Sequence, residues 1–248
     1  MQKTAIFITF LLTLSLQCMN MSVYDDKIYI LDGFNRELFV FNDDGSKEHT
    51  VCLKNISRSG YFDFFIKRDR FYSLIHDCFN GSVYVLDEKY EVRKTITLKN
   101  IYEEEIAPKI YPAGSSSMFF STSDYLSIYI LRDNRARMII LSEIPYTDFF
   151  SDGKNIFLLY NDHISVYTVS GIFIKKIPLP LPETPYSSLY ITSSHIFLHN
   201  LYGITYLKKD LSDSGFMEDM SIISYAGTGD TLFYSSIVSK IKIWRAKN

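Results

Sequence analysis

The sequence predicts an all-β fold, a six-bladed β-propeller whose last blade can be incomplete. An alternating apolar strand motif recurs six times in the 248 residues, at intervals of 36 to 45 positions. That period matches a four-stranded blade. Tyr and Phe number 19 each, against 11 Gly and one Trp, and these aromatic residues favour strands. No segment shows a convincing amphipathic helical period.

Composition excludes two broad classes of protein. The chain is 47% hydrophobic, which is too apolar for a disordered chain. It has 28 acidic and 26 basic residues, for a net charge of −2. Nucleic-acid binding requires a concentrated basic face, so we expect no nucleic-acid partner.

The first eighteen residues are typical of an export signal. Lys3 is their only charge, and Ala5–Leu16 is an uncharged apolar run of 12 residues. A membrane span needs about 20 such residues. We therefore predict a signal peptide at 1–18 and a single β-propeller domain at 19–248. The expected location is the periplasm, or the outer membrane or cell surface.

Cys18 stands where a lipoprotein signal places its lipid-bearing cysteine, although Gln17 is larger than the small residue usual before it. We expect membrane contact only through a lipid on Cys18. The alternative is that Thr4–Phe10 remains in the fold as a strand that closes the ring. Cys52 and Cys78 are compatible with a disulfide or with two free thiols.

The repeated motif is the predicted third strand of each blade. It comprises Leu38–Phe41, Val83–Leu86, Ile128–Leu131, Ile164–Tyr167, Ile204–Leu207 and Ile241–Trp244. A second strand precedes each one, at Lys27–Leu31, Arg70–Leu74, Met118–Phe120, Ile156–Leu159, His195–Leu198 and Thr231–Tyr234. Polar turns rich in Asn, Asp and Gly join each pair, since these residues tolerate tight hairpin geometry.

Outer and connecting segments complete the predicted blades. Fourth strands are expected at His49–Leu53, Lys94–Leu98, Met138–Leu141 and Ile172–Ile177, and a first strand at Tyr61–Ile66. Asn100–Ala113 is expected to be a long loop between blades two and three. Pro178–Pro182 is expected to link blades four and five, because Pro lacks the N–H of an inner ladder. Blade six ends after its third strand, which leaves it incomplete unless the N-terminal segment seals it.

Two stretches carry a family resemblance. Ile28–Gly45, with the sequence IYILDGFNRELFVFNDDG, resembles the NHL-type repeat. Ile156–Pro180 resembles this repeat as well. Both resemble six-bladed propellers common among exported proteins and lipoproteins of Bacteroidetes. The resemblance implies a propeller in the cell envelope and leaves the activity open, because propellers host binders and enzymes alike.

The turns between second and third strands should share one face of a propeller with the connections between blades. They bring together short polar and aromatic side chains. The candidate residues of this ligand-binding face are Asp32, Asn35, Arg36, His76, Asp77, Asp124, Tyr160, Asp162, His163, His199 and Tyr202. Aromatic side chains among polar ones are typical of recognition surfaces. The same residues can also be ordinary turn formers.

The leading functional prediction is a non-catalytic binding module for an unknown protein or small-molecule ligand, acting as a monomer. It includes no catalytic residue, metal ligand or cofactor. The alternative is a metal-assisted hydrolase or lyase, which needs at least three of a set of six side chains within reach of one ion: His76, Asp77, Asp124, Asp162, His163 and His199. A third is a shortened propeller that needs a partner strand. Arg36 can hold a carboxylate or phosphate, or pair with Asp32 or Glu37.

Overall fold

The computed structural model is built from strands. It describes residues 19–57, 62–65, 73–77, 81–98, 109–113, 117–122, 124–133, 135–180, 184–219, 222–228, 231–236 and 241–245, and these contain no α-helix. The predicted signal peptide at 1–18, the alternative closing strand Thr4–Phe10 and Cys78 lie outside these residues. Cys52 is exposed and its thiol is free.

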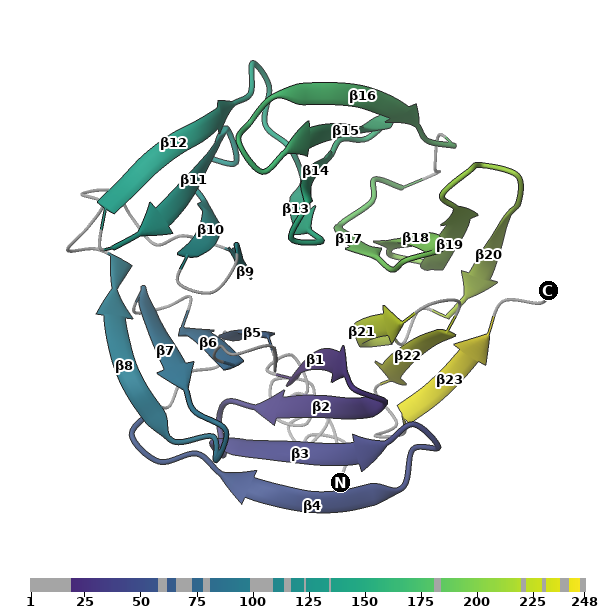
Figure 1. The fold of residues 1–248 in the computed structure, drawn as a ribbon. Coiled ribbons are helices and arrows are strands. Elements are labelled where there is room, and N and C mark those ends of the chain that lie inside the picture. Colours follow the sequence, from purple (N-terminus) through teal and green to yellow (C-terminus); the bar gives the residue numbers. More distant parts are fainter. Residues whose placement is uncertain are drawn as a thin grey trace, which may run out of the picture. The chain divides into compact units, whose positions relative to one another are not determined.

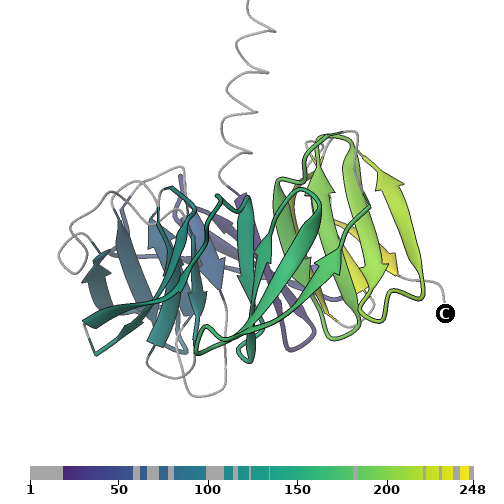
Figure 2. The same ribbon diagram turned by 90° about the horizontal axis from the view of Figure 1, so that it is seen from above.

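The strands form up-and-down antiparallel sheets, and five of them have four strands while one has three. Figure 2 shows strands of one sheet running alternately in opposite directions. Such a meander is the blade of a propeller, so the predicted all-β propeller fold is confirmed. Blade six has three strands within the described residues.

The chain divides into two compact units, residues 1–96 with 221–248, and residues 97–220. The first unit contains blades one, two and six (Figure 1). Blade one consists of β1 (Met19–Tyr24), β2 (Lys27–Asp32), β3 (Glu37–Asn42) and β4 (Lys47–Cys52), and blade two of β5 (Phe62–Phe65), β6 (Ser73–Asp77), β7 (Ser82–Leu86) and β8 (Val92–Thr97). Blade six consists of β21 (Ile222–Thr228), β22 (Thr231–Ser236) and β23 (Ile241–Arg245). In this unit β1 contacts both β21 and β5, so the first strands of three blades lie side by side.

The second unit repeats this arrangement. It contains blade three, β9 (Ile110–Pro112), β10 (Ser117–Ser121), β11 (Ser127–Arg132) and β12 (Arg135–Leu141); blade four, β13 (Asp148–Ser151), β14 (Asn155–Leu159), β15 (His163–Thr168) and β16 (Phe173–Pro178); and blade five, β17 (Ser188–Ile191), β18 (His195–Asn200), β19 (Gly203–Lys208) and β20 (Ser214–Glu218). Here β13 contacts both β9 and β17. We call the first strand of each blade its inner strand and the fourth its outer strand.

Burial falls from inner to outer strands. All four residues of β13 are buried, and Ile156 to Leu159 of β14 are buried on both faces of the sheet. Four of the six residues of β16 are exposed before Ile177 becomes buried. A continuous apolar run therefore marks strands packed between neighbouring blades, whereas outer strands need only one or two apolar anchors.

Most predicted strands are confirmed, with small differences at their ends. Blade two differs most, because Arg70–Leu74 was expected where β6 spans Ser73–Asp77. The antiparallel register explains the shift, since Ser73 pairs with Leu86 and Asp77 with Ser82. The second strand therefore extends to Asp77, beyond Leu74, where the apolar pattern predicted its end, and comes nearer to the third-strand motif Val83–Leu86. Asp77 is paired with Ser82, the residue after Gly81.

The prediction that Asn100–Ala113 is entirely a loop is wrong. Ile110–Pro112 form β9, the inner strand of blade three, with Ile110 and Tyr111 buried. Pro112 is accommodated because β9 is the edge of its sheet. The same rule holds for Pro178, which ends the outer strand β16.

Candidate functional site

The turns between second and third strands lie at the same end of each blade as the connection to the next blade. This follows from the alternating strand directions, and it places most candidate residues at one end of their blades. In the second unit the described residues of these turns are 122 with 124–126, 160–162, and 201–202. The first of these turns and the second form one connected cluster.

The centre of this cluster is a stacked pair of rings from blade four. The rings of Tyr160 and His163 stack with centroids 4.6 Å apart and planes inclined by 14°. His163 Nδ1 lies 2.6 Å from Asp162 Oδ1, and the Tyr160 hydroxyl lies 2.7 Å from Ser142 Oγ. We call Ser142, Tyr160, Asp162 and His163 the blade-four cluster. Its contacts fix both rings before any ligand arrives.

Exposure within the blade-four cluster is unequal. The side chain of Asp162 is 69% exposed, while that of His163 is only 12% exposed. The carbonyl of Asp162 accepts a hydrogen bond from the Leu179 N–H at 2.9 Å, which fixes the turn to the chain after β16. The carboxylate is therefore presented to solvent from a rigid backbone.

Blade three extends the cluster through the turn that contains Asp124. Asp124 Oδ1 accepts hydrogen bonds from Thr122 Oγ1 at 2.5 Å and from the Leu126 N–H at 2.9 Å. The adjacent Tyr125 ring packs edge-on against Tyr146 at 5.8 Å. Tyr146 in turn donates to the Ser127 carbonyl at 2.9 Å. The connection from blade three to blade four thereby joins both turns.

The two acids of this region are charged at neutral pH. The pKa of Asp162 is lowered mainly by its hydrogen bond with His163. The positive charge of Lys176 lowers the same pKa by a smaller amount. The hydrogen bond from Thr122 likewise lowers the pKa of Asp124. Burial raises the pKa of the Tyr160 and Tyr146 hydroxyls, so both remain protonated. The carboxylates of Asp124 and Asp162 are therefore exposed and charged, whereas the neutral Tyr146 and Tyr160 are buried.

Blade five holds the next two candidates in a separate set of contacts. His199 Nδ1 lies 3.2 Å from Ser187 Oγ, and burial lowers the pKa of His199. Asn200 Oδ1 accepts hydrogen bonds from the N–H groups of Tyr202 and Gly203, at 2.9 and 3.1 Å. These contacts are those of a well-capped turn.

In blade one, Asp32 shapes its own turn. Its two carboxylate oxygens accept hydrogen bonds from Asn35, from the backbone N–H at 3.0 Å and from Nδ2 at 2.8 Å. Arg36 has a positive φ of 57°, and its carbonyl accepts a hydrogen bond from the Leu53 N–H. The prediction that Asp32 accepts hydrogen bonds within its turn is confirmed. The predicted ion pair of Arg36 with Asp32 or Glu37 is not observed among the described residues.

The remaining two candidates lie on β6 of blade two. His76 pairs with Val83 and Asp77 with Ser82 in the backbone register. Within the described part of the chain, no group of three or more His, Cys, Asp or Glu side chains is arranged to hold a metal ion. No helix in the described residues is long and apolar enough to cross a membrane.

Sequence reasoning missed a buried ion pair that joins three blades. Lys109 Nζ lies 2.6 and 2.8 Å from the two carboxylate oxygens of Asp148. The Asp148 carboxylate also accepts hydrogen bonds from the N–H groups of Phe149 and Leu189, each at 2.8 Å. Lys109 precedes β9, Asp148 begins β13 and Leu189 lies in β17. Burial raises the pKa of Asp148, and Lys109 opposes this effect.

No protein-family model matches the chain. No curated protein matches it either. Solved structures resemble it in fold. One is PorZ, an essential bacterial surface component of the type-IX secretion system of Porphyromonas gingivalis, with 9% identity and a TM-score of 0.59 over 91% of this chain but only 36% of that one.

Two further structures cover more of their own chains. Virginiamycin B lyase from Staphylococcus aureus is 14% identical with a TM-score of 0.59, over 93% of this chain and 84% of that one. Kuenenia stuttgartiensis hydrazine synthase is 11% identical with a TM-score of 0.60, over 92% and 83%. At these identities the likeness shows the β-propeller fold alone, and the same fold serves a secretion-system surface component and a lyase.

Proposed function

We propose that the chain is an exported, non-catalytic binding module whose ligand contacts the blade-four cluster. The observation that supports this most is the fixed Tyr160–His163 stack beside the exposed, ionised Asp162. The hydrogen bonds of His163 with Asp162 and of the Asp162 carbonyl with Leu179 already hold the turn that presents this carboxylate, so a ligand meets a surface whose ordering cost is largely met. A protein or small-molecule ligand can use it.

The charge of the face defines the chemistry of the ligand. Asp162 and Asp124 present carboxylates from neighbouring blades, and both are stabilised as anions. Carboxylates bind guanidinium groups through strong charge-assisted hydrogen bonds. The proposed ligand therefore presents an arginine-like cation to Asp162.

Calorimetry with a tetra-arginine peptide tests the binding role. We expect wild-type protein to bind this probe, and Asp162→Asn to weaken binding about tenfold because a charge-assisted bond is lost. Asp210→Asn is the matched control, since Asp210 is an exposed turn carboxylate in the same unit whose pKa is lowered by Ser212. Equal binding by wild type and Asp162→Asn, or preference for tetra-glutamate, would contradict the proposal.

The enzymatic alternative has a separate test. Elemental analysis of gently purified protein measures bound divalent ions. A stoichiometric ion, together with hydrolysis or lyase activity that disappears on chelation, would support the metal-assisted alternative and contradict a non-catalytic role. We expect neither result.

Export rests on the predicted signal peptide and on the resemblance to NHL-type propellers of Bacteroidetes. N-terminal sequencing of the mature protein from its native host tests it. A start at Cys18 supports a lipid-anchored envelope protein, and a start shortly after Cys18 supports a periplasmic or surface protein without a lipid. An intact Met1 would contradict export.

A further inference from the structure

An exposed apolar surface lies on the outer strands of blades three and four. It consists of Met138, Leu141, Ile144, Ile172, Phe173 and Ile174, which we call the blade three–four patch. Leu141 and Ile172 are each 66% exposed, and Phe173 is 50% exposed although its ring also packs edge-on against Tyr167. Side chains this apolar are normally scattered singly on a surface, and a cluster indicates an interaction site.

The two halves of the patch are in direct contact. The turn between β15 and β16 lies so close to β12 that a Cβ on Gly171 would collide with the carbonyl oxygen of Ile139. Met138 directly precedes Ile139 on β12, Leu141 lies two residues after it, and Ile172 directly follows Gly171. The exposed side chains of the two blades therefore form one surface within the second unit.

Both loops that present the patch are fixed by hydrogen bonds. In the turn before β16, Ile172 donates its N–H to Thr168 Oγ1 at 3.0 Å and accepts from the Thr168 N–H at 2.8 Å. After β12, Ser142 Oγ donates to the Ile144 carbonyl at 2.6 Å. Ile172 and Ile144 are thus held at the surface by rigid turns instead of folding back onto the protein.

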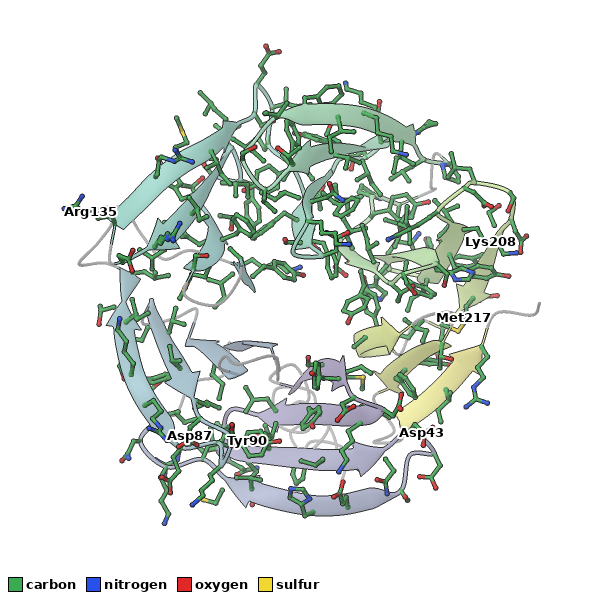
Figure 3. The ribbon with its side chains drawn as sticks, viewed as in Figure 1. Asp43, Asp87, Tyr90, Arg135, Lys208 and Met217 are labelled. Atoms are coloured by element: carbon green, nitrogen blue, oxygen red, sulfur yellow. The ribbon has the colours of Figure 1, made fainter. Side chains whose placement is uncertain are left out.

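Basic side chains lie next to the apolar ones on the same two outer strands. Arg135 and Arg137 on β12, and Lys175 and Lys176 on β16, are all exposed. Figure 3 shows Arg135 pointing away from its blade at the start of β12. Of the nearby acids, Asp133 lies beside Arg132, Glu143 follows Leu141 and Asp162 interacts with Lys176. Cations therefore outnumber anions around the patch.

The backbone edges of these strands are poor templates for an added strand. The register of β12 shifts opposite Ile128 and Tyr129, and that of β16 opposite Val166 and Tyr167, so each outer strand carries a β-bulge. Bulges on outer strands disrupt the ladder and discourage pairing with another strand. The side chains are therefore the means of attachment. Apolar side chains beside cations are complementary to an anionic lipid surface, because the apolar groups can enter the acyl boundary while the cations meet the headgroups.

We infer that the blade three–four patch binds the surface of an anionic membrane, with Ile144 and Ile172 inserted among the lipids and the basic side chains at the headgroups. This contact is additional to any lipid on Cys18. An electrostatic contact with anionic headgroups adds to whatever membrane affinity a lipid supplies.

Vesicle sedimentation of the full-length chain tests the inference. The probes are vesicles of phosphatidylcholine alone and vesicles in which part of the phosphatidylcholine is replaced by the anionic lipid phosphatidylglycerol. We expect tighter binding to the anionic vesicles and at least about tenfold weaker binding for Lys175→Glu/Lys176→Glu. Ile172→Ser should weaken binding about fivefold by removing an inserted side chain.

Matched controls come from the equivalent turn of blade five. Leu211 is an exposed apolar residue between Lys208 and Asp213, where nearby acids offset the charge (Figure 3 labels Lys208). Leu211→Ser and Lys208→Glu/Lys209→Glu should bind vesicles as wild type does. Every variant retains residues 1–18, so differences among them report on the patch.

Tryptophan fluorescence gives a local readout. Ile172→Trp should shift its emission to the blue when anionic vesicles are added, whereas Leu211→Trp should not. Equal binding to neutral and anionic vesicles, unchanged binding by the Lys175/Lys176 double variant, or no shift for Ile172→Trp would each overturn the inference. Patch-dependent self-association without vesicle binding would instead assign the patch to a second copy of the chain.

Discussion

Inner and outer strands of the same blade follow different rules. In blade four the inner strand β13 buries every residue and holds a buried carboxylate, Asp148, in four contacts. The outer strand β16 exposes most of its residues and carries a bulge. The inner strand is specified by its neighbours in adjacent blades, while the outer strand is specified mainly by its pairing with β15.

The largest expected effect is at the buried ion pair. Asp148→Ala should destabilise the protein by about 3–5 kcal/mol, because it leaves the Lys109 ammonium partly buried without its partner. Urea denaturation of purified protein measures this. Glu48→Ala is the control, since the Lys27–Glu48 pair is about one-third exposed and should contribute less than about 1 kcal/mol. Equal losses would show that the inner position is not special.

Two phenylalanines sharpen the comparison without involving charge. Phe149 on β13 is fully buried, with its ring edge-on to Tyr111 at 5.0 Å. Phe149→Ala should cost about 3–5 kcal/mol through lost burial and a cavity. Phe173→Ala on β16 should cost under about 1 kcal/mol, because half of that ring is already in solvent. The midpoints of urea unfolding distinguish the two variants.

One position on a third strand, next to the outer strand, should be as sensitive to substitution as an inner-strand position. Gly203 begins β19 with a φ of 153°, and a Cβ there would collide with the Met217 carbonyl oxygen on β20. We expect Gly203→Ala to destabilise the protein by about 1–3 kcal/mol through strain and displacement of β20. Thermal unfolding measures the loss, with Gly153→Ala as the control, since its φ is also positive but no atom lies within contact distance. Similar losses would show that φ alone sets the cost.

The smallest expected effect is a pH dependence at His199. Burial lowers the pKa of His199 in the folded protein below its ordinary value of 6.5. The unfolded chain therefore binds the proton more readily, so this contribution to stability is complete above pH 6.5 and is lost as pH falls through the lowered pKa. Thermal unfolding between pH 5 and 7.5 should show a weaker pH dependence for His199→Gln. An unchanged slope would assign the dependence to other groups.

The sequence predicts the strands well wherever both faces of a strand are buried. Ile156–Leu159 is recognisable because every residue must be apolar. By contrast β20 has only Phe216 and Met217 between polar residues, and its alternating exposed pattern gives no continuous run. Strand β9 has only three residues before its turn, so propensity alone does not separate it from a loop.

The candidate site was partly predictable for a related reason. Tyr160, Asp162 and His163 come from one turn, so sequence proximity already groups them. Ser142 and Tyr146 belong to the connection from blade three, and their contacts depend on how blades pack. The ion pair of Lys109 with Asp148 spans 39 positions and leaves no local pattern. Charged residues before apolar inner strands are its only trace in the sequence.

The carboxylate of Asp148 receives hydrogen bonds from both flanking repeats, and this has a consequence for how such a protein can change over generations. A propeller built from independent units could gain, lose or exchange a unit by gene duplication or recombination. Removing or transplanting blade four alone would leave the Lys109 ammonium of one neighbouring blade and the Leu189 N–H of the other without their hydrogen-bond acceptor. Blades three to five should therefore be inherited together, as one indivisible block.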